Sequence, residues 1–165
     1  MAEYFGDLIF ADSNGMCFGE IYATDVANTI TIAGTGYGNR VQITSFAVNG
    51  VSNNATPDHT NDHITITKAG MYLCTVSIAT TSAGGTGAYL VGFGVFKNNG
   101  ATGFSNLHAH RNLSGGLSDH GSISMSGIID LAATDTVEVW CWNVTNTNNI
   151  VIDDITLSLL QIGGT

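Results

Sequence analysis

Apolar and polar residues alternate along almost the whole chain, which is the pattern of half-buried β-strands. No ten-residue window shows the 3.6-residue period of a helix. The sequence therefore predicts an all-β protein, a sandwich or barrel of many short strands. The predicted strands cover residues 16–25, 29–33, 41–48, 62–67, 70–80, 88–97, 104–109, 121–131, 135–142 and 150–162.

Glycine, rather than proline, supplies the breaks between these strands, since the chain has 21 glycines and one proline. Asn14-Gly15, Asn49-Gly50 and Asn99-Gly100 are the strongest turn signals, because both residue types tolerate a positive φ. The polar segments 52–61 and 111–120 are predicted to be loops.

Several predicted strands carry apolar residues on both faces. In 70–80 one face begins with Tyr72, yet the opposite face carries Met71 and Leu73 beside Thr75. In a monomeric antiparallel sandwich the outer faces are exposed to water, so apolar and polar residues alternate regularly along each strand. Because exposed apolar patches of this kind are uncommon on monomers, the pattern indicates an interface between subunits.

Four segments, in this order, resemble the C1q/TNF-like jelly-roll family: AGMYLCTVSI, VGFGVFKNNG, SGIIDLAATDTVEVW and the closing LSLLQIG. Together they cover about residues 62–162. The sequence departs from the family at Thr134, where a glycine is usual before Asp135, and it lacks the family's Phe-x-Gly before the last strand.

The resemblance implies a ten-stranded C1q/TNF-like jelly-roll β-sandwich of two antiparallel sheets. It also implies a tight homotrimer, in which one sheet uses its inner face for the core and its outer face for the neighbouring subunits. The side chains expected at that trimer interface lie on three strands. They are Met71, Leu73, Thr75, Ser122, Ser124, Ser126, Leu160 and Ile162.

Residues 1–15 are expected to form an N-terminal arm, and residues 16–165 the jelly-roll domain. Neither collagen repeats nor the basic region of a signal peptide is found, so the sequence looks most like a virion member of this fold, made in the host cytoplasm. We therefore expect a bacteriophage capsid decoration or head-fibre protein whose arm binds the major capsid protein at the capsid surface. The expected capsid-binding residues of the arm are Tyr4, Phe5, Leu8, Ile9 and Phe10.

The alternative is a receptor- or glycan-binding tip of a phage tail or fibre. It would use the polar loops 52–61 and 98–120 with aromatic residues such as Phe104. A decoration protein should co-sediment with shells, whereas a tip should bind host cells.

Composition and charge narrow the range of partners. Charged residues make up 10% of the chain, against roughly a quarter in ordinary soluble proteins. The formal net charge is −9 with only four basic residues, so the chain would repel a phosphate backbone, and nucleic acid is not an expected partner. No apolar run reaches the length of a membrane-spanning helix, and no membrane partner is expected.

Three polar groupings in the sequence are candidate metal sites. His108-x-His110 places two imidazoles on one strand face, as in metal-binding cupins, but the glutamate of that motif is missing; a solvated or trimer-axis pair is the alternative. His120 beside Asp119 would complete a site only across a threefold axis. The remaining grouping is a polar turn or a Ca²⁺ loop, made by the oxygen-bearing side chains of Asn53, Asn54, Asp58 and Asp62.

Catalytic groupings are equally incomplete. Asp153 and Asp154 are adjacent, so they point to opposite faces of a strand unless a bulge intervenes. Trp140 and Trp142 share a face with Glu138, where burial is favoured over sugar stacking. No serine-nucleophile motif occurs, and the three cysteines show no paired spacing, with Cys74 and Cys141 on predicted buried faces. The sequence thus predicts a non-enzymatic structural protein with no cofactor and no bound metal.

Overall fold

The computed structural model describes residues 15–85, 87–116 and 119–164. The described chain forms twelve strands and one short 3-10 helix, η1. They are β1 (Phe18–Ala23), β2 (Asn28–Ile30), η1 (Tyr37–Asn39), β3 (Val41–Gln42), β4 (Val48–Asn53), β5 (Ala55–Asp58), β6 (His63–Ile66), β7 (Gly70–Ser82), β8 (Tyr89–Lys97), β9 (Thr102–Leu113), β10 (His120–Leu131), β11 (Thr136–Asn143) and β12 (Ile150–Gly163).

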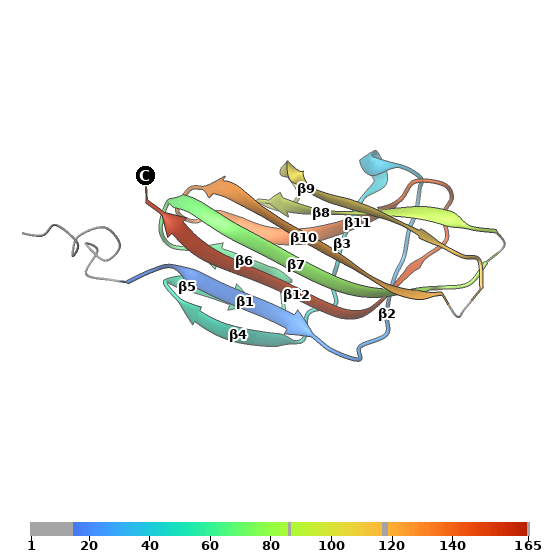
Figure 1. The fold of residues 1–165 in the computed structure, drawn as a ribbon, viewed down its shortest axis with the longest axis horizontal. Coiled ribbons are helices and arrows are strands. Elements are labelled where there is room, and N and C mark those ends of the chain that lie inside the picture. Colours follow the sequence, from blue (N-terminus) through green and yellow to red (C-terminus); the bar gives the residue numbers. More distant parts are fainter. Residues whose placement is uncertain (1–14, 86, 117–118, 165) are drawn as a thin grey trace, which may run out of the picture.

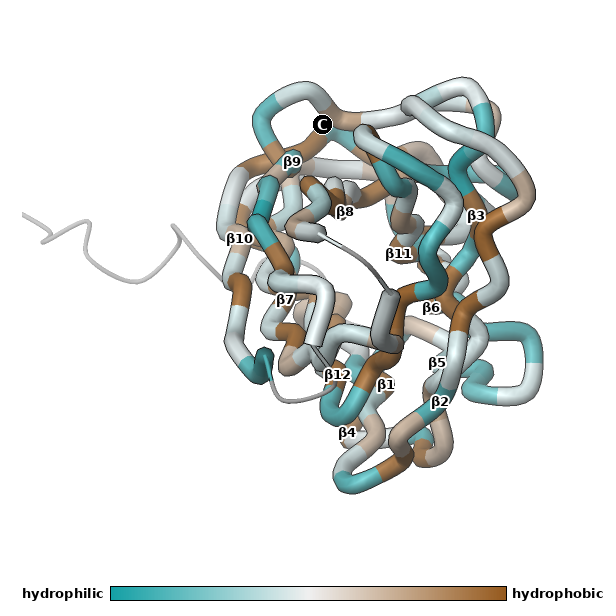
Figure 2. The backbone as a smooth tube through the Cα atoms, turned by 90° about the vertical axis from the view of Figure 1, so that its right-hand side faces the viewer, coloured by the Kyte–Doolittle hydropathy of each residue, from teal (hydrophilic) through white to brown (hydrophobic). Residues whose placement is uncertain are grey.

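The strands form two six-stranded sheets. The first sheet has the order β10-β7-β12-β1-β4, with β2 also paired to β12. The second has the order β5-β6-β11-β8-β9, with β3 also paired to β11. The strands run along the length of the molecule (Figure 1), and an end-on view shows the two sheets facing each other (Figure 2). The predicted all-β sandwich of two antiparallel sheets is confirmed.

The core fills the space between the sheets with alternate residues of each strand. On β7, Tyr72, Cys74 and Ile78 have no exposed surface, and Phe93 and Val95 of β8 face them from the second sheet, equally buried. Each fully buried side chain of this kind contributes about 1.5–3 kcal/mol. The predicted buried face of 70–80 is therefore confirmed.

Four sequence predictions were wrong in detail. Most of segment 52–61 is strand rather than loop, because β4 and β5 follow each other across Asn54, whose φ is 52°, and only residues 59–61 belong to a turn. Asn49-Gly50 lies inside β4 rather than at a turn. The expected strand at 41–48 shrinks to the two residues of β3, and β9 continues to Leu113, into the expected loop 111–120. In contrast, Asn99-Gly100 does make the β8–β9 turn, with positive φ at both residues.

Both ends of the described chain lie at the same end of the sandwich (Figure 1). There Phe18 of β1 pairs with Leu160 of β12. The predicted arm residues Tyr4, Phe5, Leu8, Ile9 and Phe10 lie outside the described residues, as does Asn14 of the first turn signal.

Candidate functional site

A row of four apolar side chains crosses the outer face of the first sheet. Cross-strand pairing sets the row, because residues directly opposite each other on neighbouring strands project to the same side. In order across β10, β7, β12 and β1, the row is Ile128, Leu73, Leu160 and Phe18. We call these four residues the apolar row. Ile128 is 51% exposed and Leu160 is 39% exposed, so the row faces solvent in a single chain.

Two more exposed apolar side chains enlarge this surface toward the end of the sheet. Met71 lies two residues before Leu73, on the same face of β7. Ile162 lies at the irregular end of β12, where the register with β7 shifts. The apolar surface is therefore concentrated at the end of the sandwich where the described chain begins and ends.

Short polar side chains occupy the middle of the same face. Ser126 of β10 lies opposite Thr75 of β7, which in turn lies opposite Ser158 of β12. The Ser158 hydroxyl donates a hydrogen bond of 3.1 Å to Glu20 Oε1 on β1. Because these side chains are short, another surface can approach the backbone of this sheet closely.

The predicted interface residues are thus brought together on one sheet face. Seven of them share the outer face of the first sheet, and the eighth, Ile162, lies at the irregular end of β12. Their role in an interface between copies stays a prediction.

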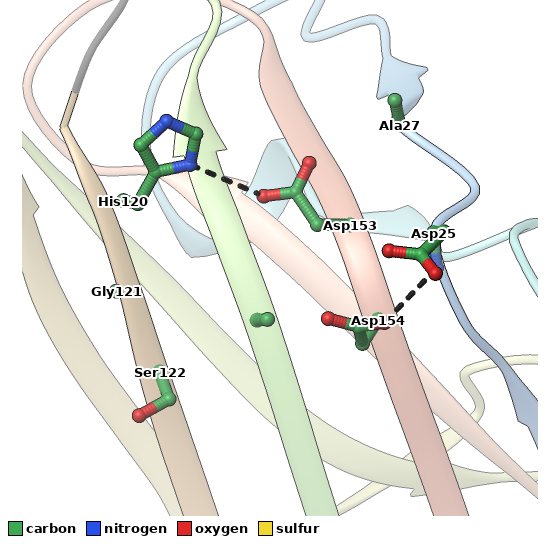
Figure 3. A pocket seen from close by; sticks show the side chains of 8 residues that line it. Asp25, Ala27, His120, Gly121, Ser122, Asp153 and Asp154 are labelled. Carbon is green, nitrogen blue, oxygen red and sulfur yellow. Dashed lines mark hydrogen bonds and ion pairs between the residues drawn. The ribbon is translucent and has the colours of Figure 1, made fainter.

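The opposite end of the face is acidic. Asp25, His120, Asp153 and Asp154 line an open depression of about 610 Å³, together with Ser122 and small residues (Figure 3). A register shift between Ile152 and Asp154 places a bulge in β12. As a result Asp153 and Asp154 line the same depression, although adjacent residues of a regular strand would point to opposite faces.

The carboxylates of Asp153 and Asp154 each accept a hydrogen bond from a neighbouring donor. The Asp25 backbone N–H donates to Asp154 Oδ1 at 3.0 Å, and the Thr81 hydroxyl donates to Asp153 Oδ2. His120 Nδ1 lies 2.7 Å from the Thr81 hydroxyl and 3.9 Å from Asp153 Oδ2. Within the described part of the chain, no group of three or more His, Cys, Asp or Glu is placed to hold a metal ion.

The candidate Ca²⁺ loop is a polar turn. The Asp58 carboxylate accepts hydrogen bonds from the backbone N–H groups of Thr60 and Asn61 and from the Asn61 side chain, which lowers the pKa of Asp58. Asp62 is buried and accepts the Phe46 N–H at 3.1 Å. Burial raises the pKa of Asp62 to about 6. The two carboxylates therefore serve separate local structures.

The histidine pair lies on the outer face of the second sheet, among aromatic rings. The His108 ring lies 5.5 Å from the Trp142 ring and the His110 ring 5.7 Å from it, centroid to centroid. Trp142 is 2% exposed and Trp140 is half-buried, so burial of Trp142, rather than sugar stacking, is confirmed. Glu138 is also buried, and its two carboxylate oxygens accept four hydrogen bonds.

Two residues of this cluster were missed by sequence reasoning. Tyr37 in η1 lies 5.1 Å from the Trp142 ring, and the Arg40 guanidinium lies 4.8 Å from the centre of the Phe96 ring. Both come from a glycine-rich segment with no strand pattern. The only available signal was that glycines at 92 and 94 leave room for a large neighbour: a Cβ at Gly92 would overlap the Trp142 indole.

The cysteines are packing residues. Cys17, Cys74 and Cys141 are all buried and unpaired, as expected for the latter two. Burial raises the pKa of the Cys74 and Cys141 thiols to about 12 in each case. Because the thiolate is the reactive form, these two cysteines are unreactive at neutral pH.

Comparison with known proteins shows the fold. No family model matches the sequence, and no curated protein matches it. Among solved structures, the chain is similar to Eiger TNF from S. frugiperda, with 12% identity and a TM-score of 0.62 over 91% of this chain and 94% of that one. It is also similar to murine APRIL at pH 5.0, with 11% identity and a TM-score of 0.57 over 89% and 99% of the two chains.

The structure of murine APRIL at pH 8.0 gives nearly the same match, with 12% identity and a TM-score of 0.56. At such low identity the likeness concerns the fold alone. No helix in the described ranges is long and apolar enough to cross a membrane. The chain has the TNF-like jelly-roll fold that the sequence resemblance implied.

Proposed function

We propose that this protein is a non-enzymatic structural subunit that acts as a homotrimer. The observation that carries the proposal is the apolar row, Ile128, Leu73, Leu160 and Phe18, on the outer face of the first sheet. Neighbouring strands lie about 4.8 Å apart, so three spacings make a row about 14 Å wide. An exposed apolar band of this kind on a soluble domain is typical of an association site.

The distribution of charge along the face supports self-association at the apolar end. The middle of the face is small and polar, while the far end carries Asp25, Asp153 and Asp154. Identical copies that meet at the apolar end bury apolar surface. Their acidic ends repel one another and therefore stay exposed to solvent. Threefold symmetry is the arrangement implied by the C1q/TNF-like resemblance, with which the fold agrees.

The proposed role of the trimer is capsid decoration or head-fibre function in a phage virion. This part depends on the sequence resemblance and on the apolar segment 1–15. The described chain begins at Gly15, and Phe18 of the apolar row follows three residues later at the start of β1. The described chain therefore starts at the end of the sandwich that carries the proposed trimer contact, and we propose that the arms of three copies bind the major capsid protein.

A pair of matched variants tests the self-association. Leu160→Asp puts a charge in the apolar row, and Val144→Asp puts one at a side chain of nearly equal exposure, 40% against 39%, in the loop after β11. We expect Leu160→Asp to have the native mass of one chain and Val144→Asp to remain a trimer. Identical masses for the two variants would contradict the proposed contact.

Co-sedimentation tests the capsid role separately. The protein is mixed with empty capsid shells, with and without residues 1–14. We expect the full chain to co-sediment and the shortened chain to remain trimeric in the supernatant. Failure of the full chain to bind shells, together with binding to host cells, would instead favour the receptor-binding alternative.

A further inference from the structure

His108 lies at the centre of the aromatic cluster on the outer face of the second sheet. Its ring centroid lies 5.6 Å from that of Tyr37, 6.0 Å from that of Phe96 and 5.5 Å from that of Trp142. Gly94, opposite His108 on β8, makes room for the ring, since a Cβ there would lie 2.7 Å from His108 Cδ2. The half-buried imidazole thus packs against three rings and the β8 backbone.

One nitrogen of this imidazole has no partner. His108 Nε2 is buried and makes no hydrogen bond. Arg40 Nε, in the same cluster, is buried and unpartnered as well. A neutral imidazole already leaves one polar nitrogen unpaired here, and an imidazolium would in addition bury a positive charge and an N–H donor without an acceptor, which costs more free energy.

Arg40 and His110 are the basic groups of this cluster, and neither can neutralise a positive charge on His108. Arg40 lies over Tyr37 and Phe96, at 4.9 Å and 4.8 Å from their ring centres, and His110 lies two residues along β9. Burial, and then the charge of His110, lower the pKa of His108.

The neighbouring strands do not compensate for that charge. On β11, the carboxylate of Glu138 is already engaged with the β8–β9 turn, Thr136 and Trp140. The residues of β8 on this face are uncharged. On β10, which borders β9, His120 and Asp130 lie on the outer face of the other sheet.

The covering segment between β2 and β3 is held to the sheet by few bonds. The Gly36 N–H donates to Asn143 O at 2.7 Å, and Arg40 Nη2 donates to Gly100 O at 2.8 Å. Tyr37 itself is 43% exposed and covers Trp142, which is 2% exposed. Segment 36–40 has no buried residue of its own, so it can lift without removing a side chain from the core between the sheets.

We propose that His108 and the covering segment 36–40 form an acid-sensitive latch, closed over Trp142 when the imidazole is neutral and opened by its protonation. The latch is a property of the single chain and is independent of any association between copies. Because the pKa of His108 in the closed form lies below the ordinary value of about 6.5, the open form binds the proton more readily. Lowering the pH through this range thus shifts the equilibrium toward the open form.

Tryptophan emission tests the latch directly, because the chain has two tryptophans, Trp140 and Trp142, and both lie in this cluster. The full-length protein is titrated from pH 8 to pH 4.5, with far-UV circular dichroism recorded in parallel. We expect the emission to move to longer wavelength with a midpoint below about 6.5, while the circular dichroism stays constant. An unchanged emission spectrum over this range would overturn the proposal.

Three variants assign the transition. His108→Phe keeps a ring in place but cannot be protonated, so its emission should stay at the neutral-pH position throughout. His120→Gln, a histidine change on the other sheet, should keep the wild-type transition. Tyr37→Ala should show the acid-type emission already at pH 8. Two results would contradict the latch: an acid transition that persists in His108→Phe, or a wild-type, neutral-pH emission spectrum for Tyr37→Ala at pH 8.

Discussion

Leu73 and Leu160 lie directly opposite each other on the neighbouring strands β7 and β12, and both side chains point away from the core. Their strands form the centre of the first sheet, where one face already covers the core with Tyr72 and Leu159. A sheet that is apolar on both faces at this end needs a second partner, and a second copy of the chain is the partner that we propose.

Self-association predicts that thermal stability depends on protein concentration. The folded, associated state gains free energy by mass action as the concentration rises, so Tm should increase between low and high micromolar protein. Leu73→Asp places a charge in the apolar row and should abolish this dependence. A Tm of the unmodified protein that is the same at all concentrations would count against an association coupled to folding.

Asp62→Asn should stabilise the protein at neutral pH. Burial raises the pKa of Asp62 from 3.8 to about 6, so the folded state binds more protons than the unfolded state between these values. Stability contributed by the protonated carboxyl is therefore present below pH 3.8 and is lost as the pH rises through about 6. Asparagine removes the buried charge, keeps an acceptor for the Phe46 N–H and tolerates the φ of 57° at this position.

The expected gain at pH 7.5 is about 1 kcal/mol, or 2–4 °C in Tm, and it should vanish near pH 4. Asp58→Asn in the same turn is the matched control. Hydrogen bonds from Asn61 and Thr60 lower the pKa of Asp58, so its neutralisation should bring no gain at pH 7.5. Equal gains from the two variants would refute the role of burial.

Glu138→Ala should destabilise the β8–β9 turn. The buried Glu138 carboxylate accepts the backbone N–H groups of Asn99 and Gly100 at 2.8 and 3.0 Å, the Thr136 hydroxyl at 2.7 Å and the Trp140 indole N–H at 3.3 Å. Losing these acceptors leaves buried donors unpaired, at a cost of about 3 kcal/mol. Thr136→Val removes one donor and should cost about 1 kcal/mol. Urea unfolding of both variants measures the difference, and a loss for Glu138→Ala no larger than that for Thr136→Val would disprove it.

Gly92→Ala should disturb the aromatic cluster. A methyl group at Gly92 would overlap the Trp142 indole, so the ring or the strand must shift, at a cost of about 1–3 kcal/mol. Gly38→Ala in η1 provides the control, because nothing lies within 4 Å of the added Cβ. Thermal unfolding followed by tryptophan emission should show a lower Tm and an altered folded-state spectrum for Gly92→Ala alone. A normal Tm for that variant would show that the cluster is loosely packed.

The long central strands were predictable from sequence because burial on one face imposes a strict alternation. In β7, Tyr72, Cys74, Val76 and Ile78 are buried and the residues between them face outward. The edge strand β4 escaped prediction because nearly all of its residues are exposed, and Val51 is 71% exposed. Without a buried face, a strand leaves no period of two in the sequence.

The candidate site was predictable in part, for the same reason. The interface residues share a face because the pleat fixes the direction of each side chain once the strand is known. The acidic depression depends on a bulge at Asp153, and the aromatic cluster depends on Tyr37 and Arg40 reaching a distant sheet. Neither a bulge nor a long-range packing contact has a local sequence pattern, so both had to come from the structure.

The native mass of the unmodified, full-length protein at micromolar concentration tests the central claim most directly. Light scattering coupled to size-exclusion chromatography, or native mass spectrometry, gives this mass without a label. We predict three times the 17.2 kDa of one chain. A mass of 17.2 kDa across the accessible concentration range would contradict self-association through the outer face of the first sheet.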